Sequence, residues 1–516
     1  MKVDYSLYLV TDPHLPGDRD LADIVSQAIK GGVGMVQYRD KISDTGDLIR
    51  IAKSLLNICR NCKIPLIIND RIDVALAIGA DGVHIGQSDM DLPTVRKLLG
   101  NDAIIGVSCS NIDEARSAAS GGANYLGIGT MFATPTKKDT KSIIGTNGTR
   151  SILETLSVMD SSIATVAIGG INAGNVRRAI IQSHASSKGL DGVAVVSAII
   201  AAENPLVAAQ ELLKVVKQST SSPREDGKYL AGLESLMSKV PQVIKTLSQV
   251  KPLCHNMTNL VVQNLAANVA IAIGASPIMS NYGGEAKDLA KAGGSLVINM
   301  GTVTHDSIQS YLQALHAYNL AGGPVLLDPV GAGATQHRRA ALQTLMSGGY
   351  FDVIKGNLDE IKAVLGESTL QQKGVDSVGS SISDNVRARI VKRVAQRERN
   401  IVVMTGVVDF LSNGIQVYSV KNGHAYLGQI TGSGCTLGTT IASCLAVEKE
   451  DKLLAVLSSL LLYEIAAERA AMQVGVNGPG TFVPAFLDAL YAIREESSIG
   501  NLLWVSAARV EEVLDL

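Results

Sequence analysis

Short apolar runs alternate with helical segments eight times across residues 1–216, and this repeat constrains the fold more than any other feature. The runs have the length of β-strands, and the segments between them carry apolar residues at helical spacing. Parallel strands need crossover connections, so this alternation predicts a parallel sheet covered by helices. We expect strands at residues 6–12, 35–41, 65–71, 82–87, 104–109, 125–130, 164–170 and 192–197.

Eight consecutive strand–helix units favour a closed (β/α)8 TIM barrel over the alternative, a doubly wound open sheet. Polar residues recur where the expected strands end, which is where barrel enzymes carry their sites. The composition agrees with an α/β core, because 50 glycines, 14 prolines and 4% aromatic residues leave aliphatic side chains and alanine to fill it. A hydrophobic content of 46% excludes collagen-like and disordered chains.

A polar, serine-rich stretch at residues 217–228 reads as a linker to a second domain over residues 229–516. A helix is expected at residues 230–250. Apolar runs that follow it predict an open α/β sheet with helices on both faces. Its expected strands are residues 252–257, 295–300, 324–329, 352–356 and 401–405, with two short ones at 414–420 and 424–429.

The charge and the cysteine content limit partners and location. A net charge of −2 with 18% charged residues does not point to nucleic acid or an anionic membrane surface. The most apolar window, residues 453–463, contains two serines and is too short to span a bilayer. No secretory signal is seen and six cysteines suit a reducing compartment, so a cytoplasmic location is expected. We interpret the single CxxC pair, Cys59 and Cys62, as a coincidence on a helix face rather than a metal site.

Charged residues stand at or after the ends of four of the expected barrel strands. Arg39, Lys41 and Lys137 supply cations for phosphoryl oxygens, and two carboxylates, Asp70 and Asp89, could share one Mg²⁺. Because the ends of barrel strands converge, these side chains predict a site for a diphosphate with its metal.

A second phosphate group is indicated by the loops after strands six, seven and eight. Thr134 and Thr136 supply hydroxyls, while Gly169–Gly170 and Val196–Ser197 could present backbone N–H groups. Each feature alone is weak, since a glycine pair is usually only a turn. Their convergence on one theme predicts a monophosphate site beside the diphosphate.

The strings QYRDK, IINDR, VHIGQSD, GVS, TPTKKD, AIGGI and VVSAI, in that order, resemble thiamine phosphate synthase over residues 5–215. That family joins hydroxymethylpyrimidine diphosphate to a thiazole phosphate and releases pyrophosphate. The resemblance implies catalytic roles for Arg39 and Lys137 in stabilising the departing pyrophosphate. Ser110 stands where many relatives have histidine. The implied ligands are Gln37, Arg39, Lys41, Asn69, Ser108 and Lys137 for the pyrimidine diphosphate, Asp70 and Asp89 for Mg²⁺, and Thr134, Thr136, Gly170, Val196 and Ser197 for the thiazole phosphate.

In the second domain, the string TGSGC at residues 431–435 precedes a helix rich in small residues. Free N–H groups at such a helix start can hold a phosphoryl group during its transfer. Asn357 and Glu360 lie near a strand end and suit water-mediated Mg²⁺ binding, and Thr405 ends another strand where a nucleotide could lie. No GxxxxGK[ST] string occurs, so a P-loop kinase is excluded.

The strings CHNMTN, AIGASPIMS, INMGT, LLDPVGAGAT, IKGN, VVMTG and ITGSGC resemble hydroxyethylthiazole kinase, of the ribokinase-like fold, over residues 235–500. The resemblance implies that Met279 and Gly432 bind the thiazole alcohol and that Lys355, an arginine in many relatives, contacts ATP together with Thr405.

Cys435 stands where most ribokinase-like enzymes have the aspartate that acts as general base. A helix N-terminus could lower its pKa and make it a catalytic base. The alternative is an inert, buried thiol. Replacement by alanine is expected to reduce phosphorylation and leave the coupling reaction intact.

Together the two resemblances predict a bifunctional thiamine-pathway enzyme that uses ATP as co-substrate and Mg²⁺ at both sites. The second half would phosphorylate hydroxyethylthiazole, and the first half would couple the product to the pyrimidine diphosphate. The alternative is a kinase of another small heterocyclic alcohol fused to a non-catalytic, regulatory barrel. The hypothesis of a non-enzymatic interaction protein is the least favoured, because it explains neither set of polar strand-end residues. The families further imply a homo-oligomer, a trimer or a hexamer.

Overall fold

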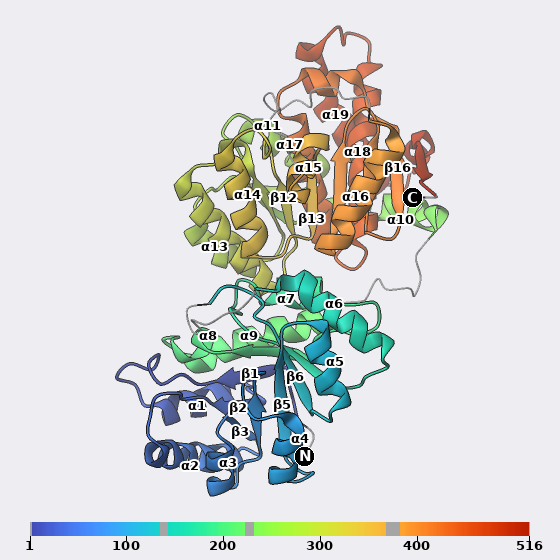
Figure 1. Cartoon of the computed structure of the whole chain (residues 1–516). Helices are drawn as coiled ribbons and strands as arrows, with labels where there is room; N and C mark the ends of the chain where they lie inside the picture. Colours follow the sequence, from blue (N-terminus) through green and yellow to red (C-terminus); the bar gives the residue numbers. More distant parts are fainter. Residues whose placement is uncertain (1–2, 135–142, 222–231, 368–381, 515) are drawn as a thin grey trace. The chain divides into compact units, whose positions relative to one another are not determined.

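The computed structural model describes residues 3–134, 143–221, 232–367, 382–514 and 516 (Figure 1). The chain divides into two compact units, Met1–Asp226 and Gly227–Leu516. Each unit has a sheet of its own.

The first unit is a closed barrel of eight parallel strands. Neighbouring strands pair in sequence order, and the barrel closes because β1 pairs with β8, with Leu9 opposite Val195. This closure confirms the TIM barrel and rules out the open-sheet alternative for this unit. The strands are β1 (Leu7–Val10), β2 (Met35–Tyr38), β3 (Leu66–Asn69), β4 (Gly82–Ile85), β5 (Ile104–Cys109), β6 (Tyr125–Ile128), β7 (Ala164–Ala167) and β8 (Gly192–Val195).

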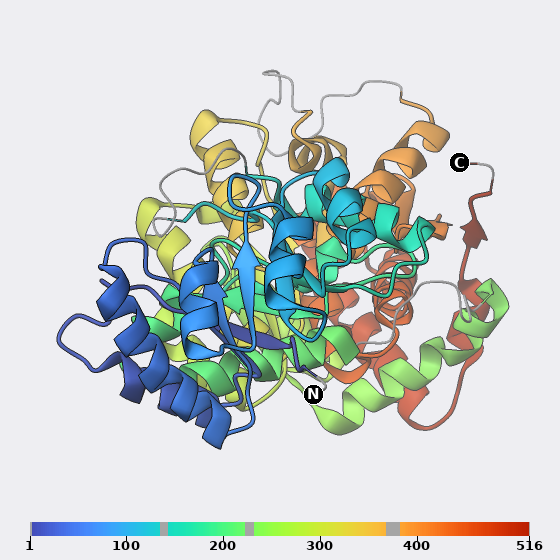
Figure 2. The same ribbon diagram turned by 60° about the horizontal axis from the view of Figure 1, so that its bottom comes forward.

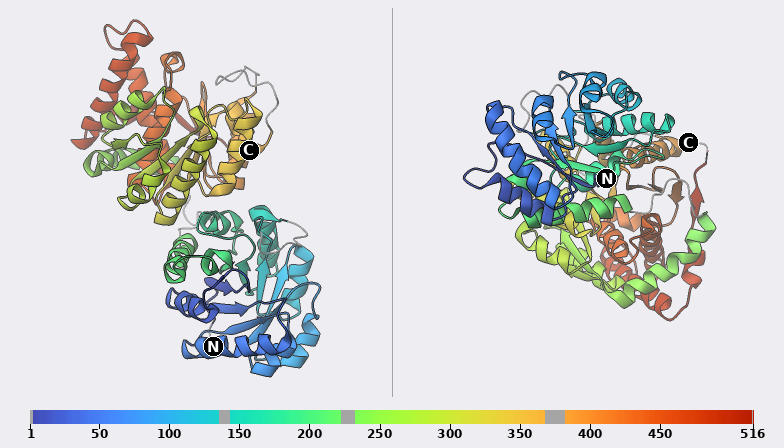
Figure 3. Two further views of the ribbon diagram at one scale, coloured as in Figure 1. Left: turned by 90° about the vertical axis from the view of Figure 1, so that its left-hand side faces the viewer. Right: turned by 90° about the horizontal axis from the view of Figure 1, so that it is seen from below.

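At least one helix follows each barrel strand. Side-chain caps at Asp20, Asp91 and Asn111 accept backbone N–H groups and fix where α1, α4 and α5 begin. The last helix, α9, packs against α1, α7 and β1, so it covers the barrel where the first and last strands meet (Figure 3). The helices are α1 (Leu21–Lys30), α2 (Thr45–Asn61), α3 (Ile72–Ile78), α4 (Leu92–Leu99), α5 (Ile112–Ser120), α6 (Gly145–Val158), α7 (Val176–Ser183), α8 (Ser197–Ile200) and α9 (Pro205–Ser221).

The expected linker begins too early. Helix α9 continues through Ser221, so residues 217–221 belong to the last helix of the first unit. The hydroxyl of Thr220 donates to the carbonyl of Val216, 3.0 Å away, which lets a polar residue continue the helix at its exposed end. Residues 222–228 of the expected linker lie outside the described residues.

The second unit is built on a nine-stranded sheet in the order β10-β9-β11-β12-β13-β14-β15-β16-β17. Strands β9 to β14 are parallel, and β15, β16 and β17 add antiparallel ribbons beyond β14. The strands are β9 (Leu253–Met257), β10 (Ser276–Ile278), β11 (Ser295–Asn299), β12 (Val325–Asp328), β13 (Val353–Asn357), β14 (Ile401–Thr405), β15 (Asp409–Ser412), β16 (Val417–Val420) and β17 (Val510–Glu512).

Helices cover both faces of this sheet, as expected, and each face has its own apolar core. Helix α10 lies beside η4, as Figure 2 shows for the green helix and the dark red segment. One face carries α10 (Leu233–Val250), α11 (Gln263–Ile273), α17 (Ser433–Val447), α18 (Lys452–Ala471), α19 (Pro479–Ser498) and η4 (Leu503–Ala507). The other carries α12 (Ala286–Lys291), α13 (His305–Ala321), α14 (Gln336–Gly348), α15 (Leu358–Leu365) and α16 (Asp384–Glu398), and the short η1 (Gly283–Glu285), η2 (Met300–Thr302) and η3 (Ala425–Gln429) complete the unit.

The apolar window at residues 453–463 lies in α18, which packs against α10, α17 and α19. A helix that is apolar on all sides is buried, and here the burial is inside the protein core. Among the described residues, no helix combines the length and the apolar character that crossing a membrane requires.

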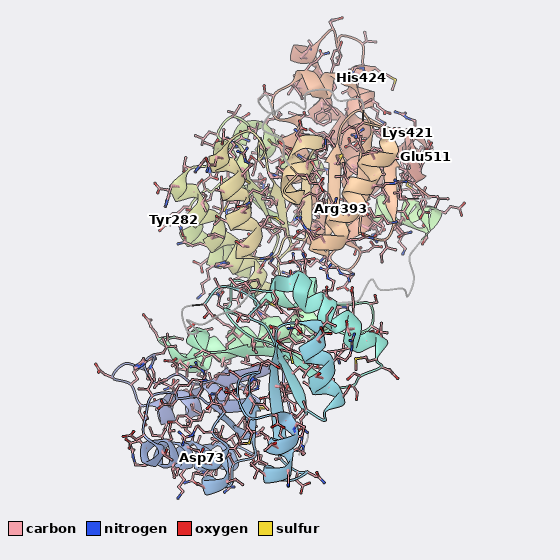
Figure 4. All side chains as sticks on the ribbon, in the orientation of Figure 1. Asp73, Tyr282, Arg393, Lys421, His424 and Glu511 are labelled. Carbon is pink, nitrogen blue, oxygen red and sulfur yellow. The ribbon has the colours of Figure 1, made fainter. Side chains whose placement is uncertain are left out.

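The strand expected at residues 424–429 is wrong, because this segment forms η3. The backbone N–H of Gly423 donates to Glu468 of α18, 2.8 Å away, and this bond turns the chain off the sheet. The edge of β16 is instead covered by β17, where Lys421 and Glu511 form an ion pair of 2.5 Å (Figure 4). Strands β10, β15 and β17 were not among the strands expected from the sequence.

Candidate functional site

A cavity of about 430 Å³ opens at the carboxyl ends of the barrel strands. It brings together side chains from every part of the barrel, as the strand-end argument predicts. Thr136 and Lys137 lie outside the described residues, and Asp70 contacts two lining residues. The predicted residues that line the cavity are Gln37, Arg39, Lys41, Asn69, Asp89, Ser108, Thr134, Gly170, Val196 and Ser197.

Asp70 is held in place by its neighbours in the loop after β3. Its Oδ2 lies 2.8 Å from Nζ of Lys41 and accepts a hydrogen bond of 2.8 Å from Asn69. Its φ of +49° falls in the left-handed region, which aspartate tolerates better than most residues. Strain of this kind concentrates at functional sites.

Asp89 lies in the turn after β4, where its Oδ2 accepts the backbone N–H of Gly86 at 2.7 Å. In both Asp70 and Asp89, Oδ2 is the carboxylate oxygen that contacts these neighbours. Two carboxylates in neighbouring loops form a hard oxygen donor set that fits Mg²⁺.

Arg39 follows β2 and is oriented by the end of β1. Its Nη1 lies 3.7 Å from Oδ2 of Asp12, and its backbone N–H donates to the hydroxyl of Thr11. The guanidinium keeps 22% of its side-chain surface exposed, so it can still contact an anion in the cavity.

Gly169 and Gly170 form the turn after β7, with φ of +89° and +70°. A Cβ on Gly170 would lie 2.7 Å from the carbonyl oxygen of Phe132, so only glycine fits. Asn175 donates to the carbonyl of Gly170 at 2.9 Å and fixes the turn against the start of α7.

Glu114 is a cavity residue that the sequence analysis missed. Its Oε2 accepts both the backbone N–H and the hydroxyl of Ser110, at 2.7 and 3.0 Å. Ser110 therefore has a defined partner, although many relatives have histidine there. A capping pattern in the sequence could have indicated Glu114. Asn111 caps the start of α5, and Glu114 is the third residue of that helix.

A chain of hydrogen bonds links five barrel side chains, and three of them, Tyr8, Tyr125 and His84, were also missed. Gln37 Nε2 donates to the hydroxyl of Tyr8 at 2.5 Å, and this hydroxyl lies 2.8 Å from that of Tyr125. Tyr125 lies 2.9 Å from His84 Nδ1, and His84 Nε2 lies 2.8 Å from the hydroxyl of Ser108. We call these five residues the Gln37–Ser108 chain.

In the second unit, polar side chains form a cluster beside the start of α17. Asn259 Nδ2 lies 3.4 Å from Sγ of Cys435 and 3.1 Å from Oδ1 of Asn299. Asn299 donates to Asp328 at 2.8 Å, and Asp328 pairs with Lys355 at 3.1 Å. Asn299 and Asp328 are the last residues of β11 and β12. They could have been predicted as site residues from the sequence, because polar side chains at the ends of parallel strands often form the site.

Lys355 is a buried member of this cluster rather than an exposed cation. Its side chain is 3% exposed, and a Cβ on Gly434 would lie 3.4 Å from its Nζ. Its positive charge therefore lies beside the first turn of α17, where the TGSGC string begins the helix.

The pKa of Cys435 is raised to about 11, opposite to the lowering expected from its place at a helix start. Burial is the main cause, and the negative charge of Asp328 adds to it, outweighing the effects of Lys355 and the two asparagines. At neutral pH Cys435 is therefore a thiol, which argues against its acting as the resting general base.

Asn357 and Glu360 form the capping box of α15. Asn357 Oδ1 accepts the N–H of Glu360, and Glu360 Oε2 accepts the N–H of Asn357, at 3.0 and 2.8 Å. Glu360 Oε1 accepts the N–H of Gly331 at 2.8 Å. Burial and the nearby Asp328 raise the pKa of Glu360 to about 7. Since the protein already uses these oxygens, they fit a metal through bridging water better than by direct contact.

The remaining predicted residues of this unit lie around the same edge of the sheet. Gly432 has a φ of +88°, and a Cβ there would lie 2.2 Å from Cγ1 of Val262. Met279 is half-buried directly after β10, and Thr405 ends β14. The loops after β9 and β10 meet, because Asn281 donates to the carbonyl of Thr258 at 3.3 Å.

The CxxC pair does not form a site. Cys59 is buried in α2 whereas Cys62 is exposed beyond its end. Across the residues described, no group of three or more His, Cys, Asp or Glu is arranged to hold a metal ion.

Fold and site together define an α/β protein with a polar cavity at the strand ends of its barrel and a polar cluster at the strand ends of its second unit. Residues 7–199 match the family described as thiamine monophosphate synthase, and residues 244–496 match the hydroxyethylthiazole kinase family. The chain is 42% identical over 528 residues to the probable thiamine biosynthetic bifunctional enzyme of Schizosaccharomyces pombe, covering 99% of each chain. It is 37% identical over 527 residues to the thiamine biosynthetic bifunctional enzyme of Saccharomyces cerevisiae, covering 96% of each.

Among solved structures, the chain is 34% identical to the hydroxyethylthiazole kinase protein of Pyrococcus horikoshii OT3. The superposition covers 54% of this chain and 99% of the kinase, with a TM-score of 0.47. The chain belongs to the family of bifunctional thiamine biosynthetic enzymes. It combines a thiamine-phosphate synthase domain with a hydroxyethylthiazole kinase domain, and both activities are transferases.

Proposed function

We propose that the second unit transfers the γ-phosphoryl group of ATP to the hydroxyl of 4-methyl-5-(2-hydroxyethyl)thiazole. The barrel then joins the thiazole phosphate to hydroxymethylpyrimidine diphosphate and releases thiamine phosphate and pyrophosphate. The observation that carries this proposal is the barrel cavity, which gathers cations, carboxylates and hydroxyls at the strand ends. A barrel that had become purely regulatory would be expected to lose part of this set.

In the barrel, Arg39 and Lys41 bind the diphosphate, and Lys137 is assigned the same role from the sequence. Asp70 and Asp89 hold Mg²⁺, which when bound neutralises charge on the leaving pyrophosphate. The C–O bond to the pyrophosphate breaks, and the thiazole nitrogen forms the new C–N bond at the same carbon. Positioning of the two substrates then matters more than acid–base chemistry.

The thiazole phosphate is assigned to the loops after strands six to eight. Thr134, Thr136 and Ser197 offer hydroxyls, and the loops at Gly170 and Val196 can present backbone N–H groups. The tight turn at Gly170 supports this assignment, since it brings backbone to the cavity without a side chain.

In the kinase unit, we assign the transferring phosphoryl group to the backbone N–H groups at the start of α17, with Lys355 and Thr405 contacting ATP, and Gly432 to the pocket of the thiazole alcohol. Asn357 and Glu360 hold Mg²⁺ through water. Met279 lines the thiazole pocket. Cys435 contacts the substrate as a neutral thiol, in keeping with its raised pKa.

We further propose that the protein is a homo-oligomer, a trimer or a hexamer. Support comes from apolar side chains beside the kinase site, because Leu260, Val261 and Tyr282 are 68%, 75% and 68% exposed. Patches of this kind mark contact surfaces. Light scattering of the full chain gives the mass, and a monomer at micromolar concentration contradicts the proposal.

A single-tube assay tests the two activities. The full chain is mixed with the thiazole alcohol, ATP, Mg²⁺ and the pyrimidine diphosphate, and thiamine phosphate is the expected product. Thiazole phosphate without thiamine phosphate contradicts the barrel assignment. Absence of ATP turnover contradicts the kinase assignment.

A further inference from the structure

The Gln37–Ser108 chain joins two residues, Gln37 and Ser108, to which the resemblance to thiamine phosphate synthase assigns binding of the pyrimidine diphosphate. Its members come from five different strands, β1, β2, β4, β5 and β6. Tyr8, Gln37, His84 and Ser108 line the cavity, and Tyr125 is fully buried behind them. The chain therefore connects the polar groups at two places on the cavity wall.

Space for the chain is built into the barrel by two glycines. A Cβ on Gly106 would lie 2.0 Å from Cζ of Tyr125, and a Cβ on Gly127 would lie 3.1 Å from Cε1 of His84. Burial raises the pKa of both Tyr8 and Tyr125 far above its ordinary value. Both phenols therefore keep their single hydrogen at any pH at which the protein works.

Each hydroxyl has one hydrogen, so in a continuous chain whose members each donate once and accept once, the direction of one bond sets the direction of the next. Gln37 Nε2 donates to Tyr8. The Tyr8–Tyr125 and Tyr125–His84 contacts fit a donor on either side, and in the order that continues the Gln37 bond Tyr8 donates to Tyr125 and Tyr125 donates to His84 Nδ1. His84 then carries its hydrogen on Nε2 and donates to Ser108. This order leaves the cavity the amide oxygen of Gln37 as an acceptor and the hydroxyl of Ser108 as a donor.

The reverse order would give the cavity the opposite pattern. With the Gln37 amide turned, its NH₂ group would face the substrate, and Ser108 would donate to His84 and accept from the substrate. A 4-aminopyrimidine offers an amino donor beside a ring-nitrogen acceptor, which matches the order that continues from the Gln37 donor. A 4-oxopyrimidine offers a carbonyl acceptor beside a ring N–H donor, which matches the reverse.

We propose that the Gln37–Ser108 chain selects a 4-aminopyrimidine over a 4-oxopyrimidine by fixing this donor–acceptor pattern. His84 and Tyr125 are then positioning residues that determine specificity through Gln37 and Ser108. The proposal rests on the synthase function proposed above. A mismatched base would leave buried donors or acceptors unpaired, which lowers its affinity.

The test uses the full chain and two competitive inhibitors of the synthase reaction. These are the 4-amino and 4-oxo forms of 5-hydroxymethyl-2-methylpyrimidine monophosphate, which have no pyrophosphate to release. The wild type is expected to bind the amino form at least about tenfold more tightly. Tyr125→Phe removes the middle of the chain and is expected to reduce this ratio about tenfold.

Tyr5→Phe is the matched control, because Tyr5 packs against Tyr125 with 5.4 Å between ring centroids but is not a member of the chain. Its inhibition ratio should equal that of the wild type. Equal weakening of both inhibitors by Tyr125→Phe would show a merely structural role and overturn the proposal, as would a wild type without preference.

A measurement on the wild type keeps the proposal testable even if Tyr125→Phe does not fold. The nitrogen-15 spectrum of His84 is expected to show the ring hydrogen on Nε2, and a hydrogen on Nδ1 alone overturns the proposed order. The proposed function fails in a different way, since a wild type that makes no thiamine phosphate would refute the synthase activity itself.

Discussion

Nζ of Lys355 and Oδ1 of Asp328 lie 3.1 Å apart, with only 3% and 1% of their side chains exposed. Removal of one partner leaves a buried charge uncompensated. Asp328→Asn is therefore expected to lower the free energy of unfolding of the kinase unit by about 3–5 kcal/mol, measured by urea denaturation.

An exposed ion pair in the same unit is the control for that variant. Arg393 and Glu367 lie 2.7 Å apart with 67% and 46% of their side chains exposed. Arg393→Met should cost less than about 1 kcal/mol. Equal losses for the two variants would contradict the view that the buried pair depends on both partners.

Cys435→Ala should reduce the kinase kcat by only about tenfold, because the thiol positions substrate rather than accepting its proton. Loss of a general base usually costs about 10²–10⁴-fold. The synthase rate of the same sample is the internal control and should not change. A kinase loss beyond about 10³-fold would restore Cys435 as the base.

Glu464 is buried in α18 beside the carboxyl of Asp409, and burial together with Asp409 raises its pKa well above the ordinary value of 4.5. Below pH 4.5 both the folded and the unfolded states hold the proton, so no stability is lost. As the pH rises towards the folded pKa, the unfolded state releases its proton more readily, and stability falls by up to about 1.4 kcal/mol per pH unit.

Glu464→Gln removes this dependence, so the variant should become more stable relative to the wild type as the pH rises from 5 to 8. Thermal unfolding across this pH range measures the difference. Glu450→Gln, at an exposed position, is the control and should follow the wild type. A constant difference between Glu464→Gln and the wild type at all pH values would contradict the prediction.

Gly170→Ala is expected to raise the KM for the thiazole phosphate about tenfold, because φ of +70° strains alanine by about 1–2 kcal/mol and its Cβ meets Phe132. Gly122→Ala separates the two causes, since Gly122 has φ of +85° with no atom within 4 Å of a Cβ. It should lower barrel stability without changing KM. A similar KM for both variants would argue against a phosphate at Gly170.

Asp89→Asn should shift the Mg²⁺ concentration for half-maximal synthase activity upward by about tenfold, because it removes one of two carboxylate ligands. The Mg²⁺ dependence of the kinase should stay as in the wild type. Asp91→Asn provides a nearby control, since Asp91 caps α4 and asparagine caps equally well. An unchanged Mg²⁺ requirement in Asp89→Asn would remove Asp89 from the metal site.

The barrel was predictable because each strand is encoded locally and closure brings all the strand ends together. The cavity lining of Gln37, Asn69 and Ser108 follows from that alone. Pairing between distant segments was not predictable, so the strand expected at residues 424–429 was wrong and β17 was missed. A local pattern cannot show which segment will occupy a sheet edge.

The local sequence pattern also could not predict the electrostatic environment of a side chain. Position at a helix start suggested a reactive Cys435, but its pKa depends on burial and on Asp328, more than a hundred residues earlier. In the sequence, Tyr8 and Tyr125 lie within apolar runs and look like ordinary core residues. Their hydroxyls acquire a function only through hydrogen-bond partners on other strands.

Helix α18 has consequences for the order in which the chain folds. Sixteen of its twenty residues are buried, against α10, α17 and α19, and α19 extends to Ser498. During synthesis, α18 therefore leaves the ribosome as an apolar helix that stays uncovered until α19 follows. The barrel is complete once α9 has formed at Ser221, so it can fold while the kinase unit is still being made. The kinase unit is thus the one that depends on protection from aggregation in the newly made protein.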